Sequence, residues 1–192
     1  MQKFKIILSA LAITILTSCS GHSKKVLIFA SSDIQLNDKN IKVSEGTTHH
    51  EQTAEFNGDK ITLSVQSPAG NLSFDLAEDG LYILNLKNDT VVGSFQRVGA
   101  EGHNKITQDE LKQKVDSLQQ LILGKNISAA NKNYFIAPNK IAKITTATNA
   151  KIFGPYTTIP ASFDAGSVPE IYKFYTNREV KEIIEKLSPM IK

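Results

Sequence analysis

Residues 61–76, which read ITLSVQSPAGNLSFDL, carry the pattern that decides the fold. In two runs, every second residue is apolar and the residues between them are small or polar. The apolar positions are Ile61, Leu63, Val65, Leu72, Phe74 and Leu76. Successive side chains of a β-strand point to opposite faces, so this period of two predicts two strands that each bury one face.

The same period extends over residues 41–98. Tyr82, Leu84 and Leu86 share one face of a further run, and a last run follows from Val91. Turn-forming sequences separate these runs, at Asn57-Gly58-Asp59, Glu78-Asp79-Gly80 and Lys87-Asn88-Asp89. Short strands at this spacing predict an antiparallel, sandwich-like meander. Upstream, residues 26–29 are continuously apolar and predict a buried strand, but no glycine-rich turn of a dinucleotide-binding unit follows them.

Two helices and further strands are predicted in the second half of the chain. Thr107 with Glu110, and Thr176 with Glu179, form capping boxes at the starts of two amphipathic helices. Gly124 suits the end of the first helix, and a proline ends the second. The intervening strands are expected at residues 134–136, 141–146, 151–153 and 171–175. The fold class is therefore α+β: a β-rich meander, a capped helix, further strands and a C-terminal helix.

The N-terminus has the organisation of a secretory signal peptide. Lys3 and Lys5 precede an apolar run over residues 6–16, which is shorter than the roughly 20 residues that a membrane-spanning helix needs. The run ends in Leu16-Thr17-Ser18-Cys19, which resembles the lipobox of bacterial lipoproteins. This resemblance implies that residues 1–18 are removed and that the thiol of Cys19 receives a diacylglycerol. The protein would then contact a membrane through acyl chains on Cys19.

The resemblance and the pattern of predicted elements together give the expected domain organisation and location. Residues 19–25 are expected to form the lipidated cysteine and a short tether, in which Lys24 and Lys25 are solvated surface residues or, as the alternative, contact anionic lipid headgroups. A β-rich subdomain would span residues 26–100 and an α+β subdomain residues 101–192. Ser20 differs from the aspartate that retains many lipoproteins in the inner membrane. We therefore expect a lipid anchor in the outer membrane, facing the periplasm.

Composition restricts the other partners and cofactors. Removal of residues 1–18 lowers the formal charge from +3 to about +1, which provides no electrostatic footprint for nucleic acid. Cys19 is the single cysteine, so the mature fold has no internal disulfide and no cysteine cluster for zinc. No cofactor motif is present, because the glycines near residue 100 lack the spacing and the lysine of a phosphate-binding loop.

Neither a metal site nor a catalytic site is predicted. His49-His50-Glu51 contains metal-ligand types, but adjacent residues of a strand point to opposite faces. His103 has Glu101 nearby, without an identifiable substrate pocket. The sequence contains neither the Gly-x-Ser-x-Gly nor the Ser-x-x-Lys motif of a nucleophilic serine. The lipobox resemblance assigns the only thiol, that of Cys19, to lipid attachment.

Aromatic residues concentrate in the second half of the chain, and the stretch that follows residue 153 is rich in proline and aromatics. A stiff aromatic loop favours recognition, so Phe153, Tyr156 and Phe163 are the candidate partner-binding residues. Core filling is the competing interpretation. The sequence favours a non-enzymatic binding or assembly role with an envelope protein. A hydrolase that acts on an envelope glycan or peptide through two carboxylates is the alternative, so enzymatic activity stays open.

Overall fold

The structure is a computed structural model, and it describes residues 22–96, 107–154, 157–160 and 169–191. Within these residues, twelve strands form three four-stranded sheets. Sheet A contains, in spatial order, β10 (Lys140–Thr145), β7 (Gly80–Leu86), β1 (Ser23–Ala30) and β4 (His50–Asn57). Sheet B contains β2 (Ile34–Asn37), β3 (Asn40–Val43), β5 (Ile61–Ser67) and β6 (Gly70–Leu76). Sheet C contains β11 (Lys151–Phe153), β12 (Ile171–Thr176), β8 (Val91–Gln96) and β9 (Asn133–Ile136).

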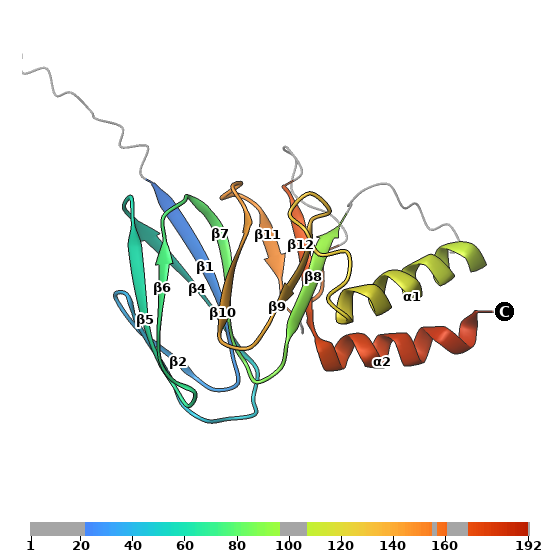
Figure 1. Cartoon of the computed structure of the whole chain (residues 1–192), viewed down its shortest axis with the longest axis horizontal. Coiled ribbons are helices and arrows are strands. Elements are labelled where there is room, and N and C mark those ends of the chain that lie inside the picture. Colours follow the sequence, from blue (N-terminus) through green and yellow to red (C-terminus); the bar gives the residue numbers. More distant parts are fainter. Residues whose placement is uncertain (1–21, 97–106, 155–156, 161–168, 192) are drawn as a thin grey trace, which may run out of the picture.

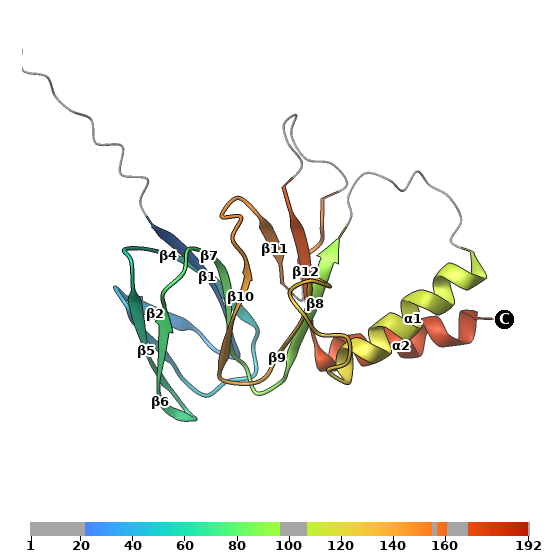
Figure 2. The same cartoon turned by 45° about the horizontal axis from the view of Figure 1, so that its top comes forward.

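The sheets stack as layers, with sheet A in the middle. Figures 1 and 2 show sheet B on one side of sheet A, sheet C on the other, and the two helices beyond sheet C. One apolar core fills the space between sheets A and B, and a second fills the space between sheets A and C. A third, smaller core lies between sheet C and the helices. Each layer therefore covers an apolar face that its neighbour would otherwise expose.

The central strands of sheet A are buried on both faces. On β1, Val26 and Ile28 enter the core shared with sheet B, while Leu27 and Phe29 enter the core shared with sheet C. Every residue of β7 is also buried. This arrangement explains the continuous apolar run at residues 26–29, because a strand covered on both sides has no polar face.

Both helices begin at the predicted capping boxes. Helix α1 (Gln108–Ile122) begins after Thr107, whose Oγ1 accepts a hydrogen bond from the Glu110 amide. Helix α2 (Asn177–Leu187) begins in the same way after Thr176, and a short 3₁₀ turn, η1 (Ser188–Met190), follows it. Gly124 takes a positive φ of 66° directly after α1, as a helix-ending glycine does. In the described part of the chain, no helix is long and apolar enough to cross a membrane.

The α+β, β-rich class predicted from the sequence is confirmed. Two details differ from an antiparallel meander. Each sheet contains one parallel pair: β1 with β7, β3 with β5, and β11 with β12. In addition, β10 joins sheet A and β8 joins sheet C, so the expected boundary near residue 100 does not separate the sheets. Alternation fixes which face of a strand is buried, but it does not fix which strands become neighbours.

β1 begins at Ser23, three residues before the strand expected from the apolar run. Ser23, Lys24 and Lys25 of the expected tether therefore belong to the sheet. Lys24 is fully buried, so the interpretation of this lysine as a solvated surface residue is wrong. The pattern missed it because a lysine normally marks the end of a buried segment.

The packing of sheet C makes a prediction at Gly93, which pairs with Phe174 across β8 and β12. A methyl group on Gly93 would overlap the ring of Phe174, which is fully buried. Gly93→Ala should therefore lower the free energy of unfolding by about 1–3 kcal/mol, measured by urea denaturation of the full chain. In a Phe174→Leu background, the same change should cost at least about 1 kcal/mol less. Equal costs in the two backgrounds would show that this ring does not restrict position 93.

Candidate functional site

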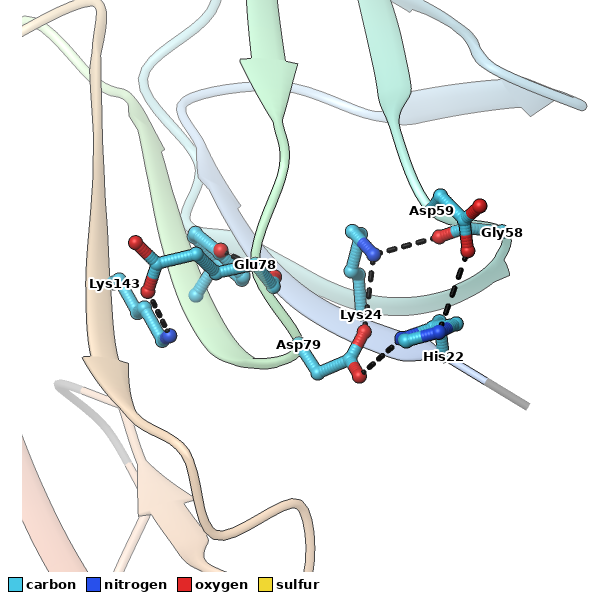
Figure 3. Close-up of polar contacts among 8 residues, drawn as sticks. His22, Lys24, Gly58, Asp59, Glu78, Asp79 and Lys143 are labelled. Carbon is cyan, nitrogen blue, oxygen red and sulfur yellow. Dashed lines mark hydrogen bonds and ion pairs between the residues drawn. The ribbon is translucent and has the colours of Figure 1, made fainter. Parts of the chain in front are cut away.

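Lys24 anchors a polar cluster at the end of sheet A where β1 begins. Its Nζ donates hydrogen bonds to the Gly58 carbonyl at 2.6 Å and to Oδ1 of Asp79 at 3.0 Å (Figure 3). β1 runs antiparallel to β4 and parallel to β7, so the turn after β4 and the turn before β7 both meet its first residues. A buried ammonium group is costly unless it is paired and hydrogen-bonded. Lys24 therefore holds the start of β1 to both turns.

His22 joins the same two turns from just outside the strand. Its Nδ1 lies 2.8 Å from Oδ2 of Asp79, and its Nε2 lies 3.4 Å from Oδ1 of Asp59 (Figure 3). Hydrogen bonds from Lys24 and then from His22 hold the pKa of Asp79 below its usual range. We call His22, Lys24, Asp59 and Asp79 the entry cluster.

An ion pair beside the entry cluster ties in the edge strand of sheet A. Nζ of Lys143, on β10, lies 2.5 Å from Oε2 of Glu78, and this contact lowers the pKa of Glu78 (Figure 3). The Tyr82 hydroxyl donates to the Glu78 carbonyl at 2.6 Å, and burial raises the pKa of Tyr82. Strands β1, β7 and β10 are thus fastened together at the end of the sheet where the described chain begins.

A second polar network lies at the opposite end of sheet A, where β4 begins and β7 ends. Nζ of Lys87 is 2.8 Å from Nδ1 of His49, and Nε2 of the same ring is 2.6 Å from Oε1 of Glu51. An ammonium group can only donate, so Nδ1 accepts and Nε2 carries the proton that is shared with Glu51. Burial is the main cause that lowers the pKa of both His49 and Lys87.

Lys173 extends this network to sheet C. From β12, its Nζ donates to the carbonyl oxygens of Gly154 and Thr157, the latter at 2.7 Å. Burial lowers the pKa of Lys173. Gly154 also packs against the carboxylate of Glu51, at a place where a β-carbon would overlap it. We call His49, Glu51, Lys87 and Lys173 the distal network, and it joins sheet A, sheet C and the chain that follows β11.

Of the residues that the sequence singled out for binding, Phe153 lies in the described part of the chain. It is half-buried at the end of β11, where it pairs with Lys173. Cys19, Tyr156 and Phe163 lie outside the described residues. Several aromatics of the second half of the chain fill the core between sheets A and C, namely Tyr134, Tyr172 and Phe174. The competing interpretation of core filling is therefore right for these three residues.

The two histidines of the motif, His49 just before β4 and His50 at its first position, contact different partners. His49 belongs to the distal network, whereas Nδ1 of His50 lies 3.1 Å from Oδ1 of Asp33. His103 lies outside the described residues. Within those residues, no group of three or more His, Cys, Asp or Glu side chains could hold a metal ion.

Sequence analysis missed the three buried lysines at positions 24, 87 and 173. Lys87 directly follows the apolar strand β7, and Lys173 lies within the apolar strand β12. A lysine at such a place in the sequence is a signal that could have predicted its burial. The partners of the three lysines are distant in the sequence, so no local spacing predicts the two networks. Comparisons with protein-family models, curated proteins and solved structures found no match to this chain. Function is therefore inferred from the residues and their geometry.

The entry cluster predicts a pH-dependent effect of Asp79→Asn. The variant should lower the melting temperature at pH 7, because buried Lys24 loses a carboxylate partner. The pKa of Asp79 is lowered in the folded state, so its stabilising contribution is complete above the ordinary value of 3.8 and is lost as the pH falls further. The difference from the wild type should be steady from about pH 5 to pH 7 and should close below about pH 4.

Asp59→Asn is the matched control, because the Asp59 side chain is 91% exposed and its contact with His22 is long. Thermal unfolding of both variants over this pH range is the measurement. An Asp79→Asn deficit that persists at about pH 2 would contradict the assignment to the carboxylate charge.

Proposed function

We propose that this protein is a lipid-anchored protein of the bacterial cell envelope that has a non-enzymatic binding or assembly role. The pattern of Lys3, Lys5 and the apolar run before Leu16-Thr17-Ser18-Cys19 supports the anchor. The observation that carries the proposal is the entry cluster, which fixes the chain a few residues after Cys19. A lipid anchor at one residue holds the folded part in a defined place when the residues that follow it closely in the sequence are held in a central strand.

The distance from Cys19 to Ser23 brings the entry cluster close to the proposed lipid surface. Four residues reach at most about 14 Å, even when fully extended. The eight residues of β1 rise by about 26 Å, so the distal network lies at the far end of the sandwich. Two or more acyl chains are needed for stable attachment, because a single chain binds membranes reversibly. We assign the anchor to the outer membrane, with the fold in the periplasm.

The binding role rests on the stretch that begins at Phe153. Lys173 holds the carbonyl groups of Gly154 and Thr157, and Thr157 donates its amide to the Gly154 carbonyl at 3.2 Å. These contacts fix Gly154 and Thr157 in the free protein, and groups that are fixed before binding lose less entropy when a partner binds. We propose that Phe153, Tyr156 and Phe163 contact an envelope protein. Tyr134, Tyr172 and Phe174 lie in the core and are not available to a partner. Phe153, Tyr156 and Phe163 therefore stay the candidate partner-binding residues.

No observation in the described part of the protein supports the alternative function, a hydrolase. Such an enzyme needs two carboxylates that face one cavity, about 5–10 Å apart. The described residues form cavities on sheet B, beside α1, at the connection between β3 and β4, and beside β11, and none of these four cavities is lined by two carboxylates. The proposed function is therefore the non-enzymatic binding or assembly role.

The anchor predicts the behaviour of Cys19→Ala. Cells that are fed radioactive palmitate should label the wild-type protein and leave the variant unlabelled, because the variant lacks the thiol that accepts lipid. The variant should also keep residues 1–18 and migrate as the larger precursor. Ser20→Ala is the control and should be labelled and processed normally. Labelling of Cys19→Ala would refute the anchor, and sedimentation of the wild type with inner-membrane vesicles would refute the outer-membrane assignment.

The partner surface predicts the behaviour of the double variant Tyr156→Ala/Phe163→Ala. Aromatic anchors of an interface typically contribute 2 kcal/mol or more each, so the double variant should bind at least about tenfold more weakly. Crosslinking in intact cells, followed by detection of the adducts, is the measurement. Phe135→Ala removes an aromatic side chain that is 38% exposed on β9, and it should leave the adducts unchanged. Wild-type adducts in the double variant would show that this loop is not the partner surface.

A further inference from the structure

The outer face of sheet B is hollowed into a cavity of about 750 Å³. The inner face of this sheet carries the apolar residues of the core shared with sheet A, such as Ile41, Leu63 and Val65. The outer face lies on the side of the stack away from the helices (Figure 1). A cavity of this volume falls within the range of small-ligand sites.

Strand register arranges the side chains of this face in two rows. The first row crosses the four strands through Asn37, Asn40, Ser64 and Ser73. The second row crosses them through Gln35, Lys42, Gln66 and Asn71. All eight residues line the cavity. Four strands at the usual spacing span about 14 Å, so each row presents polar groups at regular intervals across the sheet. We call these eight side chains the amide face.

The amide face is almost uncharged, and its groups are open. Five of its side chains are carboxamides, two are hydroxyls, and Lys42 carries the single charge. Among the described residues, none of the eight side chains has a hydrogen-bond or ion-pair partner. The adjoining part of the same face differs, because Asp75 there accepts a hydrogen bond from Thr62 at 2.7 Å and pairs with Lys60 at 2.9 Å. The face therefore divides into a self-paired part and a part that is available to a ligand.

We infer that the amide face binds a neutral glycan chain. Carboxamides both donate and accept hydrogen bonds, and a polyhydroxylated chain offers both kinds of partner along its whole length. The near absence of charge fits a neutral ligand better than a nucleic acid, which needs several basic contacts. A peptide would need apolar pockets for its side chains, whereas the exposed side chains that line this cavity are carboxamides, hydroxyls and one ammonium group.

Preorganisation strengthens this inference. The eight side chains project from a hydrogen-bonded sheet whose opposite face is locked into a core, so the positions of their Cα atoms change little on binding. The inference goes beyond the proposed function, because it requires neither Cys19 nor the stretch that begins at Phe153.

Calorimetry on the full chain in mild detergent tests the inference. The neutral probes are the hexamer of β-1,4-linked N-acetylglucosamine and maltohexaose, and the anionic probe is the hexamer of galacturonic acid. At least one neutral hexamer should bind more tightly than the anionic one. The double variant Gln66→Ala/Asn71→Ala should weaken this binding by about tenfold or more, because it removes two adjacent carboxamides.

The double variant Gln113→Ala/Gln119→Ala is the matched control, because it truncates two carboxamides on the exposed side of α1. It should bind the neutral hexamer like the wild type. Three results would overturn the inference: no binding of either neutral hexamer at millimolar concentration, tighter binding of the anionic hexamer, or equal binding by Gln66→Ala/Asn71→Ala and the wild type. Palmitate labelling reports on the anchor separately, so failure of one proposal is distinguishable from failure of the other.

Discussion

Burial of sheet A on both faces is the constraint on which the rest of the structure depends. β1 and β7 expose apolar side chains to both sides, so one covering sheet is not enough. Sheet B covers one face and sheet C the other, but sheet C then has an apolar outer face of its own. Val92 on that face contributes to the core beneath α1 and α2. The sequence of layers, from sheet B through sheets A and C to the helices, follows from successive coverage of apolar faces.

A sheet that is buried in this way tolerates polar groups only where every partner is supplied. Asn85, on β7, is fully buried, and its Nδ2 donates to the carbonyl oxygens of Asp89 and Ile136, both at 2.9 Å. Its Oδ1 accepts the amide hydrogen of Lys87 at 3.0 Å. Asn85 thus connects the end of sheet A to β9 of sheet C. Lys24 and Lys173 follow the same rule, because each buried ammonium group donates to a carbonyl oxygen just beyond the end of a strand, that of Gly58 after β4 and that of Gly154 after β11.

The sequence predicted the elements better than their arrangement. Periodicity located the strands of residues 61–76 and the faces that they bury, and capping chemistry located the first residue of each helix. β4 escaped notice because Ala54 and Phe56 are the only residues of this edge strand in the sandwich core, and the rest of the strand is polar. The parallel pairing of β1 with β7 was also unpredictable, because the paired residues, such as Lys24 and Gly80, lie far apart in the sequence and no local signal encodes their register.

The candidate sites divide in the same way. Cys19 is marked by a contiguous motif, so the sequence alone suggests it, whereas the distal network assembles His49, Lys87 and Lys173 from three separate regions. The amide face lies between these cases. Alternation shows that Ser64 and Gln66 point away from the core, but register is needed to align them with the polar residues of β2, β3 and β6.

The proposed anchor and the proposed glycan face are geometrically compatible. The entry cluster lies at one end of the strands of sheet A (Figure 3), whereas the amide face belongs to sheet B, which forms one side of the stack (Figure 1), so attachment near Cys19 leaves this face uncovered. The rows of the amide face run across the strands. A glycan chain bound along a row would therefore cross the strands of sheet B. A short anchor then sets the height at which the chain is held, because Cys19 is only four residues from the first strand.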